Sequence, residues 1–90
     1  ISKSMSSLKY KQLYWRSRRG MLELDLRLVP FVEEKFLTLK PEEQEAYEEL
    51  LAKEDWQIYD WLRGVGSPDD ESLKLIVSTI VAFNHNASKD

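Results

Sequence analysis

The chain has 90 residues, of which 42% are hydrophobic, so it holds the material for one small domain with a single core. It contains no cysteine, which excludes disulfide bonds and cysteine-ligated metal sites as sources of stability. No apolar run approaches the roughly 20 residues that a membrane-spanning helix needs, so we expect no such helix.

The net charge of −3 conceals a strong asymmetry along the chain. The residues before Glu23 include six Lys and Arg and no acid, whereas from Glu23 onward sixteen acidic residues stand against seven basic ones. A basic segment on an acidic body is typical of an electropositive patch that binds an acidic protein or a nucleic acid. A solvated helix end produces the same pattern, so composition leaves both interpretations open.

The first predicted helix covers residues 7–18. Leu8, Lys11, Tyr14 and Trp15 recur there at helical spacing. Gly20 follows at a position suited to end the helix, because glycine readily adopts the left-handed backbone of a helix C-cap. Glycine also leaves a bare backbone that a partner can approach closely, and the two roles are compatible.

Residues 22–28 alternate between leucine and charged residues, a period that by itself favours a half-buried strand. Leucine is a good helix former, however, and the chain offers no second strand for pairing. We therefore predict a helix over residues 21–36, kinked or broken near Pro30. Asp25 falls within the apolar face of that helix and needs a partner. The candidates are Arg18 and free backbone N–H groups at the corner between the first two helices.

The third predicted helix begins at Pro41, and the fourth begins at Asp55, a residue suited to cap a helix N-terminus. Gly64 is placed to end the fourth helix. The expected inner face of the third helix is Ala46, Tyr47, Leu50 and Leu51. The fourth helix carries an aromatic cluster that we assign to core and helix packing rather than to a ligand site: Trp56, Tyr59 and Trp61.

The fifth predicted helix has Ser67 as its N-cap and Pro68 at its first position. Its apolar stripe consists of Leu73, Ile76, Val77, Ile80 and Phe83. The chain is therefore predicted to be all-α, a compact single-domain bundle of about five helices. That domain spans residues 1–90, with an ordered core over about 7–84 and flexible ends at 1–6 and 85–90.

The stretch from Trp15 to Asp25, WRSRRGMLELD, resembles the signature of the FAD assembly factors of succinate dehydrogenase. These form the bacterial SdhE family, with the mitochondrial succinate dehydrogenase assembly factors as relatives. The family's Arg-Gly-x-x-Glu motif is matched by Arg19, Gly20 and Glu23. Further matches at corresponding distances are Pro30-Phe31, Asp60-Trp61-Leu62, Gly66 and Pro68. The resemblance covers about residues 8–83.

The resemblance implies a non-catalytic assembly factor, or chaperone, for flavinylation. Its partner would be the flavoprotein subunit of succinate dehydrogenase or fumarate reductase. FAD would become bonded to a histidine of that partner, so this chain would bind no cofactor itself. We expect a monomer in the bacterial cytoplasm, or in the mitochondrial matrix if the source is eukaryotic. Residues 55–61 resemble the mitochondrial members more than the bacterial ones.

The resemblance also places the partner-binding surface at the motif. Arg19 would be a forked donor to a partner carboxylate or carbonyl, and Glu23 would accept from partner donors. The alternative is an ion pair between Arg19 and Glu23, but an exposed pair contributes only about 0–1 kcal/mol. The other predicted partner-binding residues are Gly20, Arg18, Arg16, Met21 and Asp25.

No other constellation indicates chemistry. The single histidine, His85, has no second metal ligand arranged with it, and no catalytic triad is indicated. The segment Gly64-Val65-Gly66 lacks the third glycine and the preceding strand of a phosphate-binding loop. The competing function is a small helical nucleic-acid-binding or antitoxin-like regulatory protein that uses the basic first helix. The acidic balance of the remaining chain argues against nucleic acid.

Overall fold

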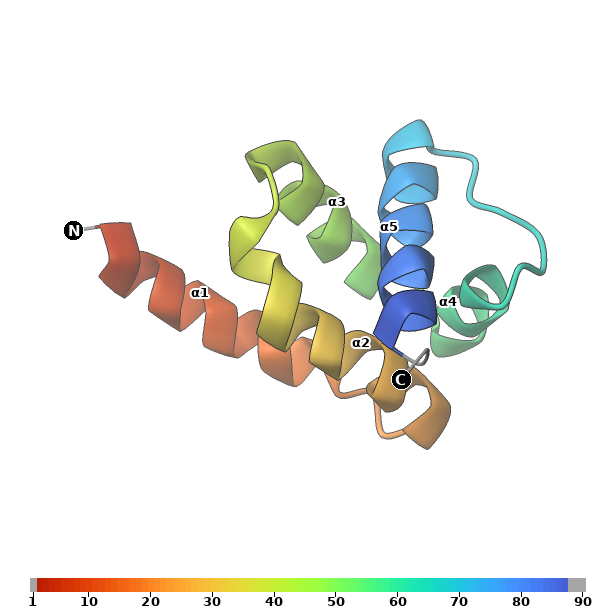
Figure 1. Ribbon diagram of the computed structural model, residues 1–90, viewed down its shortest axis with the longest axis horizontal. Coiled ribbons are helices and arrows are strands. Elements are labelled where there is room, and N and C mark those ends of the chain that lie inside the picture. The colour runs from red at the N-terminus through yellow and green to blue at the C-terminus, as the bar shows by residue number, and fades with distance from the viewer. Residues whose placement is uncertain (1, 88–90) are drawn as a thin grey trace.

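The computed structural model describes the backbone of residues 2–87 and the side chains of residues 9–86. This part of the chain forms five α-helices and one short 3-10 helix and has no strand, which confirms the all-α prediction (Figure 1). The elements are α1 (Ser2–Ser17), α2 (Leu22–Lys35), η1 (Phe36–Thr38), α3 (Pro41–Leu51), α4 (Asp55–Leu62) and α5 (Glu71–Ala87). Of the ends predicted to be flexible, residues 1 and 88–90 lie outside the described residues.

The core forms where α5 packs against α2, α3 and α4, while α1 packs against α2 and α3 (Figure 1). Phe31 of α2 joins three helices, because its ring lies 5.6 Å from the rings of both Tyr47 on α3 and Phe83 on α5. The inner face predicted for α3 is confirmed, since all four of its residues are buried. The stripe predicted for α5 is also buried, apart from Phe83, which is half-buried against the core.

The leucine alternation of residues 22–28 is resolved by helical geometry. Leu24 and Leu28, four positions apart, are buried, whereas Leu22 and Leu26 are exposed. The predicted helix is therefore confirmed, and it runs through Pro30 without a break. Proline removes the N–H that would bond to the carbonyl of Leu26. Leu26 lies on the exposed side of the helix, where water can satisfy that carbonyl.

The inner face of α1 differs from the predicted spacing. Among residues 9–17 of α1, Leu13 and Ser17 are buried, whereas Tyr14 is half-buried and Trp15 is 64% exposed; the side chain of Leu8 lies outside the described residues. Ser17 donates its hydroxyl hydrogen to the carbonyl of Leu13 at 2.8 Å, so the hydroxyl of Tyr47 must donate to Ser17 Oγ, 2.6 Å away. Burial raises the pKa of Tyr47 well above its ordinary value. A polar bond thus fixes α1 against α3, and no apolar pattern predicts it.

The helix ends agree with the sequence in part. Pro41 and Gly64 begin α3 and end α4 as predicted, but the N-cap of α4 is Glu54, whose N–H donates to the side chain of Gln57 at 3.2 Å. The predicted start of α5 at residues 67–68 is wrong. The helix begins at Glu71, because the carboxylate of Asp70 accepts the N–H of Ser72 at 2.7 Å and supplies the cap. No helix in residues 2–87 is both long and apolar enough to cross a bilayer.

Candidate functional site

The predicted motif lies in the loop between α1 and α2 and in the first turn of α2. Gly20 turns this loop with a φ of +84°, a left-handed conformation that glycine adopts at little cost. A Cβ added at Gly20 would meet no heavy atom within 4 Å outside its chain neighbours, so this side of the loop is open. Arg18 and Arg19 separate Gly20 from the last residue of α1. Gly20 therefore turns the loop rather than capping the helix, contrary to the prediction, and its bare backbone is accessible.

Arg19 turns its side chain into the protein, and only 15% of that side chain is exposed. Its Nε donates to Asp55 Oδ1 at 2.7 Å. Its Nη1 donates to the carbonyl of Leu51 at 2.8 Å and to that of Arg16 at 3.2 Å, and Nη2 donates to the carbonyl of Lys53 at 2.9 Å. The guanidinium thus fastens the α1–α2 loop to the connection between α3 and α4, which we call the Arg19 clamp.

The clamp uses most of the N–H donors of the Arg19 guanidinium. Four of its five N–H groups are engaged by the bonds just described. The forked donation expected of Arg19 is therefore directed at acceptors of this chain. No ion pair joins Arg19 to Glu23 within the described residues, since the anionic partner of Arg19 there is Asp55.

Asp25 is paired inside the corner between the first two helices, as predicted. Its Oδ1 accepts the backbone N–H of Arg19 at 2.7 Å, and its own N–H donates to the carbonyl of Met21 at 2.9 Å. Of the two predicted partners, a free backbone N–H is the one that the structure uses. Arg19 is consequently held through both its backbone and its side chain.

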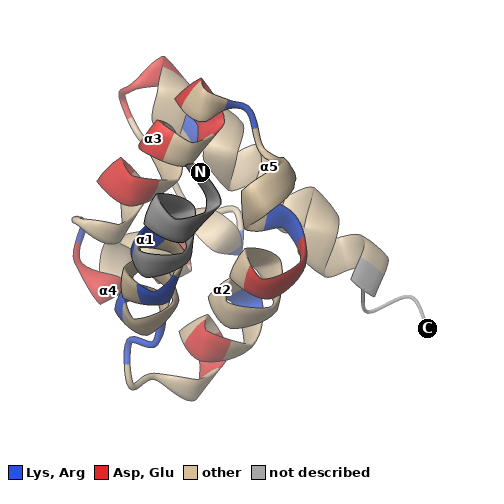
Figure 2. Ribbon diagram, turned by 90° about the vertical axis from the view of Figure 1, so that its left-hand side faces the viewer, with Lys and Arg blue, Asp and Glu red and all other residues tan. Residues whose placement is uncertain are grey.

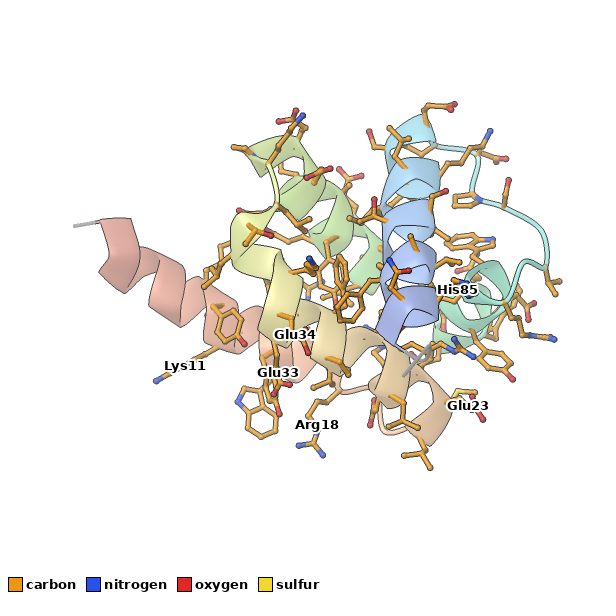
Figure 3. The ribbon with its side chains drawn as sticks, viewed as in Figure 1. Lys11, Arg18, Glu23, Glu33, Glu34 and His85 are labelled. Carbon is orange, nitrogen blue, oxygen red and sulfur yellow. The ribbon has the colours of Figure 1, made fainter. Side chains whose placement is uncertain are left out.

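Glu23 has the opposite surroundings. It is exposed in the first turn of α2 and projects away from the helix (Figure 3). No hydrogen bond or ion pair holds its carboxylate within the described part of the chain. Leu22 and Leu26 are 71% and 62% exposed on the same helix. The beginning of α2 therefore presents a carboxylate together with apolar side chains.

A groove of about 590 Å³ lies beside the clamp. Met21 and Arg19 of the α1–α2 loop form one side, and the other side runs along residues 51–56 to Tyr59. Trp56 lines this groove and is 64% exposed. The prediction that the aromatic cluster of α4 belongs to the core is therefore right for Tyr59 and Trp61, which pack against the core, and wrong for Trp56.

Two cations of the basic segment, Lys9 and Arg19, are paired with acids of other elements in the described part of the chain. Lys9 pairs with Glu48 of α3 at 2.8 Å, and Arg16 donates to the carbonyl of Glu48 at 3.4 Å. Figure 2 shows basic positions in blue on α1 and its following loop, and acidic positions in red on α3. Arg18 and Lys11 point outward (Figure 3), and Arg18 lies over the ring of Trp15 at 5.6 Å from its centroid.

Among the described residues, no group of three or more His, Cys, Asp and Glu side chains could hold a metal ion. His85 lies near the C-terminal end of α5 (Figure 3).

Comparison with known proteins gives consistent matches over most of the chain. The family described as flavinator of succinate dehydrogenase matches residues 11–84. The FAD assembly factor SdhE of Pseudomonas aeruginosa is 46% identical over 71 residues, which are 79% of this chain and 84% of that protein. The FAD assembly factor SdhE of Coxiella burnetii is 44% identical over 73 residues, which are 81% and 89% of the two chains. The matched family region includes the Arg19 clamp and the groove beside it.

Proposed function

The chain belongs to the family of succinate dehydrogenase flavinators, and from this premise we propose that it binds a flavoprotein subunit and promotes covalent attachment of FAD to it. The flavoprotein, called the client below, is the subunit of succinate dehydrogenase or of fumarate reductase. The observation that carries the proposal is the exposed carboxylate of Glu23, which follows the bare turn at Gly20 and has no partner within the described residues.

The surface around Glu23 suits binding better than stability. An exposed carboxylate without a partner adds little to the free energy of folding, whereas one charge of a desolvated interfacial pair can be worth about 2–5 kcal/mol. Leu22 and Leu26 supply apolar area next to it. The proposed contact residues are Gly20, Glu23, Met21, Arg16 and Arg18, and Arg19 and Asp25 hold the α1–α2 loop in place.

The role that we propose is one of binding and orientation. FAD supplies the reactive flavin when it is bound, and the residue that becomes bonded to it is a histidine of the client. The residues of this chain would hold the client in one arrangement, which raises the fraction of client in a reactive geometry without contributing a catalytic group. The relatives named above are bacterial, and we propose action as a monomer in the bacterial cytoplasm.

The test is the Glu23→Ala variant. Its unfolding free energy should stay within about 1 kcal/mol of the parent, since no described contact is lost. With an apo client and free FAD, however, it should fail to support flavinylation. Covalent flavin is measured as protein-bound fluorescence on a denaturing gel.

The matched control is Glu45→Ala, which removes an exposed glutamate from α3. This control should keep full flavinylation. Normal flavinylation by a folded Glu23→Ala protein would show that the motif is not the surface that promotes flavinylation. Loss of activity only because Glu23→Ala unfolds would return Glu23 to a structural role.

A further inference from the structure

Trp56 is placed as a binding residue rather than as a packing residue. It stands in the first turn of α4 and exposes 64% of its surface, whereas Tyr59 and Trp61 of the same helix pack against the core. Exposed tryptophan is uncommon because its large ring gains from burial. Tryptophan is also among the residues that most often dominate binding at interfaces.

The groove beside Trp56 has the composition of a docking site for an apolar side chain. Five of the nine residues that line it are apolar or aromatic, namely Met21, Leu51, Ala52, Trp56 and Tyr59, and the other four are charged, namely Arg19, Lys53, Glu54 and Asp55. Its volume of about 590 Å³ falls within the range of roughly 300–1,000 Å³ in which proteins bind small groups. Protein interfaces likewise combine an apolar and aromatic core with a polar rim.

The charges near the groove have a slight excess of carboxylates, since Glu54, Asp55 and the nearby Glu23 stand against Arg19 and Lys53, and this excess favours a cationic neighbour for that apolar side chain. The positive charge of Arg19 is already paired with Asp55 at 2.7 Å. Glu23 is exposed two residues after Met21, and Glu54 is exposed on the groove itself. The groove is thus continuous with the motif through Met21, and the exposed carboxylates on its two sides complement Lys or Arg.

Arg19 determines whether the two sides stay together. Its guanidinium bonds the carbonyls of Leu51 and Lys53 and the carboxylate of Asp55, the residue just before Trp56. Its backbone N–H is held by Asp25 of α2. The α1–α2 loop and the start of α4 therefore share one fixed point.

We propose that the client-binding surface is composite: Trp56 binds an apolar side chain of the client in the groove, and Glu23 binds a neighbouring Lys or Arg. Arg19 is the positioning residue that holds these two halves in register. The inference rests on the proposed function and identifies the second half of the client-binding surface. The occupant is one segment of the client that carries an apolar and a cationic side chain close together.

The first experiment measures the affinity of the full chain for the apo client. Trp56→Ala should weaken binding by about tenfold or more, while Trp56→Phe should retain most of the affinity because it keeps an aromatic ring. Leu75→Ala on α5 is the matched control, since Leu75 is also 64% exposed, and it should change affinity by less than about twofold. Thermal melting confirms that each variant is folded.

The second experiment tests the positioning role of Arg19 with a double-mutant cycle. Arg19→Lys keeps the charge but loses the planar fork, so it should weaken binding. Trp56→Ala should then cost clearly less affinity in the Arg19→Lys background than in the parent, because the groove is already out of register. Asp55→Asn is the milder second variant if Arg19→Lys does not fold. Additive losses would mean that Arg19 does not act through Trp56.

The Glu23→Ala variant in the same assays separates this inference from the proposed function. If Glu23→Ala abolishes binding while Trp56→Ala binds normally, the composite surface is wrong and the proposed function stands. If the parent protein neither binds the client nor promotes flavinylation, the proposed function itself fails. A loss with Trp56→Ala that is rescued by Trp56→Phe, together with non-additivity, supports the composite surface.

Discussion

The glycines of two Arg-Gly pairs in the molecule have almost the same φ, but the arginines have opposite surroundings. Gly20 and Gly64 adopt φ values of +84° and +85°, and a Cβ on either would meet no heavy atom within 4 Å. Arg63 pairs with Asp60, three residues earlier, and its side chain is 49% exposed. Arg19 pairs with Asp55, thirty-six residues later, and its side chain is 15% exposed.

The difference shows how one dipeptide serves two purposes. The turn at Gly64 is local, because the N–H of Val65 donates to the carbonyl of Asp60 at 2.7 Å and the N–H of Gly64 donates to that of Trp61 at 3.1 Å. These two bonds form the standard glycine ending of a helix. The turn at Gly20 has no such ending and depends on contacts with α2 and the α3–α4 connection. Of these two turns, only the one at Gly20 brings together segments that are distant in the sequence.

The largest expected effect comes from removing the two arginine side chains. Arg19→Ala leaves two part-buried carbonyls and a carboxylate without their charged donor, so it should lower the free energy of unfolding by about 2–4 kcal/mol. Arg63→Ala breaks one exposed pair and the contact of the guanidinium with the ring of Tyr59, 4.8 Å from its centroid, and should cost about 1 kcal/mol or less. Urea denaturation of both variants measures the difference, and equal losses would contradict the long-range role of Arg19.

The next largest loss of stability is expected from substitution of Asp25. Asp25→Ala leaves the N–H of Arg19 without its acceptor in a part-buried position and should cost about 1–3 kcal/mol. Asp25→Asn should cost less, because the amide oxygen can still accept that N–H. Urea denaturation again provides the values. Two variants that unfold at the parent's midpoint would mean that the bond contributes nothing to the corner.

The fold was predictable wherever local chemistry decides it. The buried faces of α3 and α5 follow the helical period, and Gly64 ends α4 through bonds within that helix and its turn. The leucine alternation was also interpreted correctly as a helix, since no second strand was available. The start of α5 was not predictable in this way. Ser67 and Asp70 both suit an N-cap, and only the path of the connection selects Asp70.

The sequence predicted which residues form the candidate site but not which contacts they make. The motif resemblance identified the residues of the α1–α2 loop, and an acid in an apolar helix face correctly predicted the pairing of Asp25. The contact from Arg19 to Asp55 has no local signal, because the two residues are thirty-six positions apart. The exposure of Trp56 was missed for a related reason: a short aromatic helix predicts burial, whereas its first turn faces a groove.

The two glycines allow a comparison at nearly equal φ. Gly20→Ala and Gly64→Ala both place a Cβ on a left-handed residue and should each cost about 1 kcal/mol of stability. Only Gly20→Ala should reduce flavinylation, since the added methyl group faces the proposed client. Melting curves and denaturing-gel fluorescence provide the two measurements. Equal flavinylation by both variants would separate Gly20 from the contact surface.

The smallest expected effect concerns the two aspartates that accept from these arginines. Both belong to α4: Asp55 is its first residue and Asp60 lies in its last turn. Asp55→Asn retains an oxygen for Arg19 but loses the ion pair and a favourable charge at the helix N-terminus, which should cost about 1 kcal/mol. Asp60→Asn loses an exposed pair and also removes an unfavourable charge from the C-terminal turn, so the two changes should nearly cancel at about 0–0.3 kcal/mol.

Salt distinguishes the causes of these two small effects. In about 1 M NaCl the Debye length falls to about 3 Å, so any cost of Asp60→Asn that comes from its exposed pair with Arg63 should disappear. The cost of Asp55→Asn should be reduced but not abolished, because the side chain of Asp55 is 44% exposed whereas that of Arg19 is only 15% exposed. Urea denaturation of both variants at about 0.1 M and 1 M NaCl makes the comparison. If the Asp55→Asn cost vanished at high salt, the clamp would behave as a surface pair and its stabilising role would have to rest on the carbonyls of Leu51 and Lys53 alone.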